Sequence, residues 1–341
     1  MKAALPNLQL ELTARCNLRC RYCYLPHKRP GARPPAEASY RQLKRTLKRV
    51  FARVALDGVT MTGGEPFLAD RFSELVLWCR LQGKAVNIIS NGNAAGAADY
   101  AALVDLGVDW FEFPLLAPAP AAHDALTRVP GSWQRARDSI AQVVAAGGRV
   151  AGVVVATAEN RDGVPATMEL LAELGAARIL INRFNVGGAG LAERERLELD
   201  RAGLRGLFAA VDRSARGLDV PVSANVCTPA CALDPADTPA LALSFCTAVA
   251  HRRPLTMNAW GDLRMCNHSP VVLGNLLQQN LESILASPAA AAWERRPAFC
   301  AACSRWHPCH GGCRAAAEQL GWGLEHEDPI CRRLGLEPFK K

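Results

Sequence analysis

The sequence predicts an α/β protein in which a parallel sheet, covered by helices on its outer face, forms a partial barrel followed by a cysteine-rich domain. Strand-like and helical stretches alternate six times within about the first 190 residues, which is the pattern of a parallel sheet. From Cys227 to Cys331 the composition changes to nine cysteines, several prolines and only short periodic segments. Six strand–helix units are too few for a closed eight-stranded barrel, so we expect an open, TIM-like (β/α)6 barrel.

The first strand and the first helix follow from hydrophobic periodicity. Residues 8–13 alternate strictly between apolar and polar side chains, as a half-buried strand does. Residues 39–54 place their apolar side chains on one helical face, and Ser39 followed by Gln42 fits a capping box at the start of this helix. The lysines and arginines between residues 44 and 53 are expected on its solvated face.

The later elements continue the alternation. A short strand at 59–62 precedes a helix whose apolar face runs from Phe72 to Cys79. Further strands are expected at 85–90, 108–115, 150–156 and 178–184, and helices near 132–146 and 164–174. Polar motifs follow several of these strands, which is where barrel enzymes place their chemistry.

These elements divide the chain into three predicted parts. Residues 1–190 form the partial barrel, and residues 191–225 form a helical connector with apolar residues at helical spacing. Residues 226–341 form a domain that we expect metal centres, rather than a large apolar core, to hold together.

Composition and charge exclude several classes of protein. Hydrophobic residues make up 50% of the 341 residues and charged residues 21%, which excludes wholesale disorder. No apolar run approaches the roughly 18 residues of a membrane helix, and the N-terminus lacks a signal peptide, so we expect a cytoplasmic protein without membrane contact. The net charge of +8 counts thiols as neutral, and no aromatic-plus-basic stripe accompanies it, so nucleic acid binding is not expected.

Thirteen cysteines are unusually many for a chain without an export signal, and clustered thiols in a reducing compartment indicate metal ligands. Cys16, Cys20 and Cys23 lie within eight residues directly after the first predicted strand. Three thiolates can hold three irons of a 4Fe–4S cluster and leave the fourth iron open. A zinc site would normally show paired cysteines with a fourth ligand, which makes it the less favoured interpretation.

This CxxxCxxC spacing, with the aromatic Tyr22 before its last cysteine, resembles the signature of the radical S-adenosylmethionine (SAM) superfamily over most of residues 8–190. The resemblance implies that the amino and carboxylate groups of SAM chelate the open iron and that the backbone around Tyr22 lies near the adenine. It also implies that an external flavodoxin or ferredoxin reduces the cluster. Reductive cleavage of SAM would then give a 5′-deoxyadenosyl radical that abstracts a hydrogen atom from the substrate.

Further motifs resemble SAM-binding elements of the same family. A GGEP turn after the second strand resembles the motif that contacts the SAM amino group, and a Ser-Asn pair after the third resembles the ribose-contacting strand end. The contacts implied are Gly63, Gly64, Glu65, Pro66, Ser90 and Asn91, with Thr157, Asn160 and Arg183 as weaker candidates. Arg183 could pair with the SAM carboxylate as a bidentate donor, and a structural ion pair is the equal alternative.

The later cysteines match the seven-cysteine spacing of the SPASM domain, which extends many radical SAM enzymes and holds two auxiliary 4Fe–4S clusters. Two structural zinc sites are the less favoured interpretation. The resemblance assigns auxiliary cluster II to Cys300, Cys303, Cys309 and Cys331, and auxiliary cluster I to Cys246, Cys266 and Cys313. With the first cluster, the chain would carry three.

The fourth ligand of auxiliary cluster I stays open at this point. Cys231 is favoured because it is nearer along the chain, and Cys227 or an open, substrate-bound iron are the alternatives. Whichever cysteine is left unused could donate a hydrogen atom to a substrate radical, or could be a small buried apolar residue.

Other residues narrow the kinds of radical SAM reaction that we expect. In sulfatase-maturing relatives a catalytic Asp follows the second SPASM cysteine; Asn267 stands here and cannot accept a proton, so sulfatase maturation is not expected. His268 could accept a proton in place of that Asp, although a hydrogen bond donated to the cluster is the favoured role of His268. The His123-Asp124 pair, in the loop expected after the fourth strand, is interpreted as structural.

The function we expect is maturation of a ribosomally synthesised peptide by cross-linking, oxidation or epimerisation. Only fifteen residues precede Cys16, which leaves no room for a leader-recognition domain, so a separate leader-recognition protein is expected to assist. The alternative is a small-molecule epimerase or dehydrogenase that acts on a sugar, aminocyclitol or other antibiotic precursor, which the compact chain suits. An electron carrier without catalytic activity would not need the SAM-binding motifs.

Overall fold

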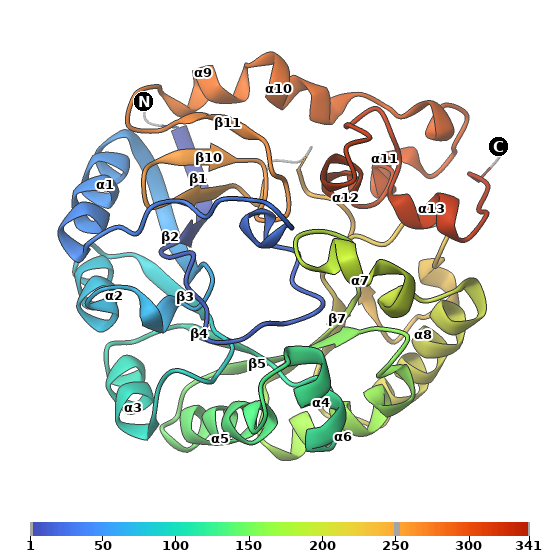
Figure 1. The fold of residues 1–341 in the computed structure, drawn as a ribbon, viewed down its shortest axis with the longest axis horizontal. Coiled ribbons are helices and arrows are strands. Elements are labelled where there is room, and N and C mark those ends of the chain that lie inside the picture. The colour runs from blue at the N-terminus through green and yellow to red at the C-terminus, as the bar shows by residue number, and fades with distance from the viewer. Residues whose placement is uncertain (1–2, 249–252, 340–341) are drawn as a thin grey trace.

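One eleven-stranded sheet organises the computed structural model, which describes residues 3–248 and 253–339. Its strand order is β11-β10-β9-β1-β2-β3-β4-β5-β6-β7-β8. The pairs from β9 through β1 to β8 are parallel, and only β9–β10 and β10–β11 are antiparallel. Figure 1 shows the sheet curled into an open ring with helices around its outside, so the predicted partial barrel is confirmed.

The strands are β1 (Ala3–Glu11), β2 (Val54–Thr62), β3 (Ala85–Ile89), β4 (Trp110–Pro114), β5 (Val150–Ala156), β6 (Arg178–Arg183), β7 (Val222–Ala224), β8 (Ala242–Leu243), β9 (Thr256–Asn258), β10 (Asp262–Arg264) and β11 (Val272–Asn275). The α-helices are α1 (Tyr40–Arg53), α2 (Phe72–Leu81), α3 (Ala97–Asp105), α4 (Pro120–Thr127), α5 (Ser132–Ala145), α6 (Val164–Glu173), α7 (Gly190–Leu197), α8 (Arg201–Ala215), α9 (Leu281–Leu285), α10 (Pro288–Ala291), α11 (Trp306–Cys309), α12 (Arg314–Gln319) and α13 (Pro329–Arg333).

The predicted elements of the barrel are present, and two helices were missed. Helix α1 begins after Ser39, whose hydroxyl accepts a hydrogen bond from the Gln42 amide at 3.3 Å. The apolar face expected on α2 is buried. Helices α3 and α4 were not predicted, and α4 carries His123 and Asp124, which were expected in a loop. Pro120 occupies the first turn of α4, where its fixed φ and missing N–H favour a helix start.

The two faces of the sheet have different side chains. Along β4, Phe111 and Phe113 are fully buried and pack against Tyr100 of α3 on the outer face. Because side chains alternate along a strand, Trp110 and Glu112 face inward. A separate apolar cluster lies on this inner face, formed by Ala151, Val153 and Leu180 with Trp110 and Val155 packed against it.

The sheet continues past the six predicted strands at both edges. Strands β7 and β8 extend it beyond β6, and β9 pairs with β1 through register partners Gln9–Thr256 to Glu11–Asn258. The short β7 and β8, of three and two residues, carry too little periodicity to be predicted from sequence. Within the described residues, none of the helices combines the length and apolar character that crossing a bilayer requires.

Candidate functional site

The loop after β1 carries the first three candidate ligands and is fixed by backbone hydrogen bonds. The amides of Arg19 and Arg21 donate to the carbonyls of Thr127 and Leu126 at the end of α4, at 3.1 and 2.8 Å. On the other side the Gly190 amide, at the start of α7, donates to the Cys23 carbonyl at 3.2 Å. Two helices therefore hold the segment between Cys20 and Cys23 in place.

The thiols of this loop fit a polynuclear metal centre. Tyr22 donates a hydrogen bond to Cys20; burial and the neighbouring thiolates raise the pKa of Cys20, and burial raises that of Cys23 to about 11. Such thiols ionise together only if bound cations neutralise them, as cluster irons do. In the described part of the chain, no three His, Cys, Asp or Glu side chains converge as they would on a single ion. In a 4Fe–4S cluster each thiolate binds a different iron, so thiols that do not converge on one point are consistent with a cluster.

The GGEP turn and the Ser-Asn pair lie against this loop, so the structure brings three predicted motifs together. Fully buried Glu65 accepts hydrogen bonds from the Asn91 amide at 2.7 Å and the Ser90 hydroxyl at 2.9 Å. The Asn91 side chain in turn reaches Cys16 Sγ at 3.7 Å and the side-chain oxygen of Asn17 at 2.7 Å. Burial raises the pKa of Glu65 to about 7, against the lowering effect of these donors.

Glycine is required in the turn because backbones approach closely there. A Cβ at Gly64 would lie 2.0 Å from the Arg15 carbonyl oxygen, and one at Gly63, whose φ is +142°, would lie 2.5 Å from that of Thr13. This approach lets the Gly64 amide donate to the Thr13 carbonyl and the Glu65 amide donate to the Arg15 carbonyl, both at 2.7 Å. The turn thereby fixes the residues that precede Cys16.

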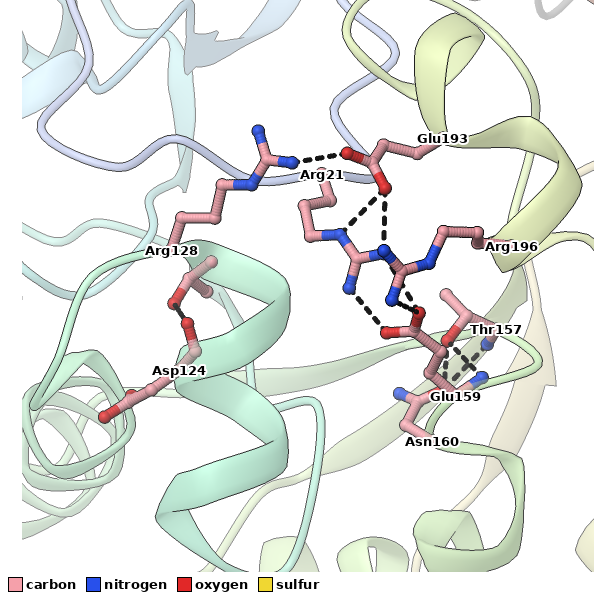
Figure 2. A network of polar contacts seen from close by, with 9 residues as sticks. Arg21, Asp124, Arg128, Thr157, Glu159, Asn160, Glu193 and Arg196 are labelled. Carbon is pink, nitrogen blue, oxygen red and sulfur yellow. Dashed lines mark hydrogen bonds and ion pairs between the residues drawn. The ribbon is translucent and has the colours of Figure 1, made fainter.

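Arg21, which sequence reasoning missed, anchors a network of ion pairs at the same end of the barrel (Figure 2). Its buried guanidinium pairs with Glu159 at 2.5 Å and with Glu193 of α7 at 2.8 Å. Arg128 also pairs with Glu193, and Arg196 with Glu159 at 3.4 Å. The hydrogen bonds from Arg21 lower the pKa of Glu193. Because Arg21 lies between two candidate ligands, the network ties their loop to α4, α7 and the loop after β5.

The weaker SAM-binding candidates are engaged in contacts within the protein. The Thr157 amide and hydroxyl donate to the Asn160 side-chain oxygen at 2.7 and 2.9 Å, and the Asn160 amide group donates to the Leu116 and Val155 carbonyls. The buried guanidinium of Arg183 pairs with Asp328 and donates to the Cys227 carbonyl at 2.8 Å. This is the structural ion pair that the sequence left open as an alternative, and it joins β6 to the C-terminal region.

Replacing Asp328 by asparagine is expected to lower the free energy of unfolding by about 3–5 kcal/mol, because the buried Arg183 charge loses its counter-ion. Both side chains are nearly inaccessible, at 4% and 1% exposure. Guanidinium unfolding of the anaerobic protein measures the change. Asp234→Asn is the control: its pair with Arg305 is 21% and 42% exposed, so a loss under about 1 kcal/mol is expected. Equal losses in the two variants would contradict this assignment.

The later cysteines form two groups, and these revise the preference for Cys231 as fourth ligand of auxiliary cluster I. The Cys227 thiol hydrogen bonds to Cys246; this bond, burial and the nearby Cys313 and Cys266 thiolates raise its pKa. Cys231 instead lies 3.9 Å from Cys331, Sγ to Sγ, in the group that contains Cys300, Cys303 and Cys309. The Pro229 carbonyl accepts hydrogen bonds from the amides of Ala232 and Leu233, so the chain turns between Cys227 and Cys231 and the two thiols join different groups.

Asn267 and His268 contact residues of the loop after β1 and of the later cysteine groups. The Asn267 amide group donates to the Tyr24 hydroxyl at 2.8 Å, directly after Cys23. His268 is buried, and burial lowers its pKa to about 4. Its Nε2 donates to the Val186 carbonyl at 2.8 Å, while Nδ1 accepts from Asn185 and stands 3.4 Å from Cys313 Sγ. His268 therefore lies beside a predicted ligand but has no N–H left to donate to its sulfur, which corrects the expected donor role.

Glu112 is a second candidate that the sequence analysis missed. It is the acidic residue of β4 on the inner face of the sheet, and its carboxylate makes no hydrogen bond or ion pair with any described residue. Burial raises its pKa to about 7, partly offset by Arg178 of β6. The guanidinium carbon of Arg178 lies 3.9 Å from the centre of the Trp110 ring. Trp110 precedes Glu112 by two residues on β4. An acidic residue between two phenylalanines at period two was the available signal.

The His123-Asp124 pair has structural roles, as interpreted. His123 Nδ1 accepts a hydrogen bond from the Leu116 amide at 3.1 Å. The Asp124 carboxylate accepts from the Gly131 and Trp133 amides at the start of α5, at 2.6 and 2.8 Å.

Two family models match the chain. The model of the radical SAM superfamily matches residues 10–171, and that of an iron–sulfur cluster-binding domain, SPASM, matches residues 246–309. Among curated proteins, the PqqA peptide cyclase of Xanthomonas oryzae pv. oryzae (strain MAFF 311018) is 28% identical over 334 residues, which cover 95% of this chain and 87% of that protein.

Solved structures show the same fold at low sequence identity. Streptococcus suis SuiB bound to its precursor peptide SuiA superposes with a TM-score of 0.73 at 15% identity, over 96% of this chain and 76% of SuiB. Native anSMEcpe with bound AdoMet and the Cp18Cys peptide superposes with a TM-score of 0.70 at 13% identity, over 97% of this chain and 94% of that one.

Proposed function

We propose a peptide-modifying reaction for this chain, which belongs to the radical SAM superfamily and carries a C-terminal SPASM domain. The observation that carries the proposal is the grouping of its thiols: three in the loop after β1, and two further groups in the C-terminal region. The reaction we propose is the cross-linking of a ribosomally synthesised peptide.

The cofactors are SAM and iron–sulfur clusters, one in the radical SAM domain and the auxiliary clusters of the SPASM domain. When bound and reduced, the first cluster and SAM supply a 5′-deoxyadenosyl radical for hydrogen-atom abstraction. In our assignment Cys16, Cys20 and Cys23 hold this cluster. Auxiliary cluster I is held by Cys227, Cys246, Cys266 and Cys313, and auxiliary cluster II by Cys300, Cys303, Cys309 and Cys331.

The other site residues orient SAM and the peptide. Glu65 shapes the turn that receives SAM by taking the Ser90 and Asn91 hydrogen bonds, and the bare backbone of Gly63 and Gly64 permits a close approach. Inner-face apolar side chains exclude water, and the unpartnered Glu112 carboxylate accepts a hydrogen bond from the peptide.

The relatives support a peptide as the substrate. The curated relative described above is named a PqqA peptide cyclase, and the two solved structures contain a precursor peptide and a peptide ligand. We further propose that a separate protein recognises the leader, that a flavodoxin or ferredoxin supplies electrons, and that the protein works in the cytoplasm, where thiols stay reduced. Residues 1–190, 191–225 and 226–341 remain our proposed division of the chain.

The test is anaerobic reconstitution with iron and sulfide, followed by dithionite, SAM and synthetic peptides encoded by short reading frames beside the gene. About twelve irons per chain, 5′-deoxyadenosine, and a peptide that has lost two hydrogens would support the proposal. SAM cleavage with every such peptide unmodified, but with a sugar or aminocyclitol oxidised or epimerised, would replace it by a small-molecule function.

Replacing Glu112 by glutamine is expected to lower peptide modification at least about tenfold, because the peptide loses its contact with the charged carboxylate. Tenfold corresponds to about 1.4 kcal/mol. Dithionite-driven SAM cleavage without peptide should stay within about twofold. The isosteric change keeps the packing of β4 and removes only the charge. The ratio of modified peptide to 5′-deoxyadenosine measures the effect. An unchanged ratio would exclude a substrate contact.

The same variant is expected to alter the pH dependence of stability. The folded-state pKa of Glu112 is raised to about 7 from 4.5, so its contribution to stability is fully present below pH 4.5 and is lost as pH rises through 7. At pH 8 Glu112→Gln should therefore be more stable than the wild type, by up to roughly 3 kcal/mol, and this gain should vanish near pH 4.5. Unfolding curves of both proteins at pH 8 and pH 4.5 measure this difference in stability. A variant that is more stable than the wild type only at pH 4.5 would contradict the raised pKa of Glu112.

A further inference from the structure

Arg314 is a completely buried arginine in the C-terminal region. It is the first residue of α12, and its exposed fraction is 0%. One guanidinium nitrogen, Nη1, donates hydrogen bonds to the Arg295 and Leu324 carbonyls at 2.6 and 3.2 Å. The other two nitrogens, Nε and Nη2, are buried and have no hydrogen-bond partner among the described residues. A buried charge with unpartnered N–H groups is costly unless an anion lies beside it.

The described carboxylates do not supply that anion, since none of them forms an ion pair with Arg314. Glu318, one helical turn further along α12, instead accepts a hydrogen bond from the Ser269 hydroxyl at 2.6 Å. Burial raises the pKa of Glu318 to about 7, so its negative charge is only partial near neutral pH. The buried Asp328 carboxylate is paired with Arg183. The charge of Arg314 therefore needs another partner.

The groups beside Arg314 belong to both auxiliary cluster sites. Cys313, which precedes it directly, is assigned to auxiliary cluster I. Trp306 lies in the segment that carries the ligands of auxiliary cluster II, and the centre of its ring lies 6.0 Å from the guanidinium carbon. Burial lowers the pKa of Arg314, and the thiolates of Cys246 and Cys300, one from each site, are the groups that oppose this lowering most.

We infer that Arg314 is the shared counter-charge of the two auxiliary clusters and raises their reduction potentials. The inference rests on the proposed function, which assigns both clusters. Four thiolates around a 4Fe–4S core of charge about +2 give a net charge of about −2, and one added electron makes it about −3. A fixed positive charge stabilises the more negative, reduced state more strongly, so it raises the potential.

A raised potential suits the proposed cross-link, in which the peptide loses two hydrogens. One hydrogen leaves as an atom to the 5′-deoxyadenosyl radical. The other leaves as a proton to water, and the electron that remains needs an acceptor. The buried charge of Arg314 makes a neighbouring cluster a better acceptor for that electron.

The experiment is an EPR-monitored redox titration of the reconstituted protein, in which the signal that changes on adding SAM is assigned to the first cluster. The variants are Arg314→Met, which removes the charge but keeps an unbranched apolar chain, and Arg314→Lys, which keeps the charge. The matched control is Arg305→Gln. Arg305 also lies between ligands of auxiliary cluster II in sequence, but its side chain is 42% exposed and paired with Asp234.

Arg314→Met is expected to lower the equilibrium constant for one-electron reduction of each auxiliary cluster at least about tenfold, which is about 59 mV. Arg314→Lys and Arg305→Gln should change it less than about threefold, and the first cluster should stay within about twofold in every variant. A merely structural role for Arg314 predicts the opposite sign, because water admitted to the site would stabilise the reduced clusters and raise their potentials.

Unchanged or raised auxiliary potentials in Arg314→Met, a shift confined to one cluster, or an equal shift in Arg314→Lys would overturn the inference. If Arg314→Met does not bind about twelve irons, the iron content of Arg314→Lys decides. Full iron in Arg314→Lys would show that the clusters need the charge, which supports the inference, and loss of iron from both variants would overturn it. Iron content and peptide modification of the wild type test the proposed function separately.

Discussion

Replacing Cys227 by alanine is expected to lower the iron content from about twelve to about eight per chain, because one auxiliary cluster loses a ligand. The thiol of Cys227 is hydrogen bonded to Cys246 and lies near Cys266 and Cys313, which together would make four cysteines around one cluster. Peptide modification should fall below detection, while the first cluster still cleaves SAM. Iron analysis and low-temperature EPR of the reduced protein measure the loss.

Two further variants make this result decisive. Cys231→Ala should keep about twelve irons, since Cys300, Cys303, Cys309 and Cys331 suffice for the other cluster. Cys79→Ala, in the buried face of α2, controls for removing any thiol. Loss of iron from Cys231→Ala alone would restore Cys231 as the ligand. Full iron in both variants would indicate an open iron in auxiliary cluster I.

Replacing Gly64 by alanine is expected to weaken SAM binding more than about tenfold, or 1.4 kcal/mol. The new Cβ would lie 2.0 Å from the Arg15 carbonyl oxygen and 2.8 Å from that of Ala14, and backbone cannot move aside as a flexible side chain does. The hydrogen bonds from the Gly64 and Glu65 amides to the Thr13 and Arg15 carbonyls, just before Cys16, would break, so the first cluster should also bind iron less well. Equilibrium dialysis with labelled SAM measures the affinity.

Gly206→Ala provides the matched control, because a Cβ there meets nothing within 4 Å on the exposed side of α8. It should leave SAM binding unchanged and stabilise the protein by about 0.5–1 kcal/mol, the usual advantage of alanine inside a helix. A Gly64→Ala protein that binds SAM within twofold of the wild type would show that the turn can relax.

Spacing within one segment of sequence predicted which motifs lie next to one another. Cys16, Cys20 and Cys23 lie in one loop, so their closeness in sequence also makes them close in space. The GGEP turn and Asn91 follow adjacent parallel strands, whose carboxyl ends necessarily meet at one edge. The helix faces of α1 and α2 were equally predictable, because their apolar periodicity reports burial directly.

Features that depend on distant segments were not predictable. The partners of Arg21 follow it by 138 and 172 residues, and no local pattern pairs them. Cys231 was preferred to Cys227 for its nearness in sequence, which the turn at Pro229 makes irrelevant. Glu112 was overlooked because the apolar signal of β4 dominates, although an unpartnered acid on a strand's inner face is what a binding site uses.

The pairing of β9 with β1 has a consequence for how the chain reaches its fold. Strand β1 emerges early from the ribosome, but its neighbour on one side is encoded about 250 residues later, as the partners Gln9 and Thr256 show. Contacts so distant in sequence form slowly, and until they form β1 offers an unpaired edge to other chains. Ending translation after the barrel helices would leave that edge open permanently, so truncated protein should aggregate rather than fold as a smaller enzyme.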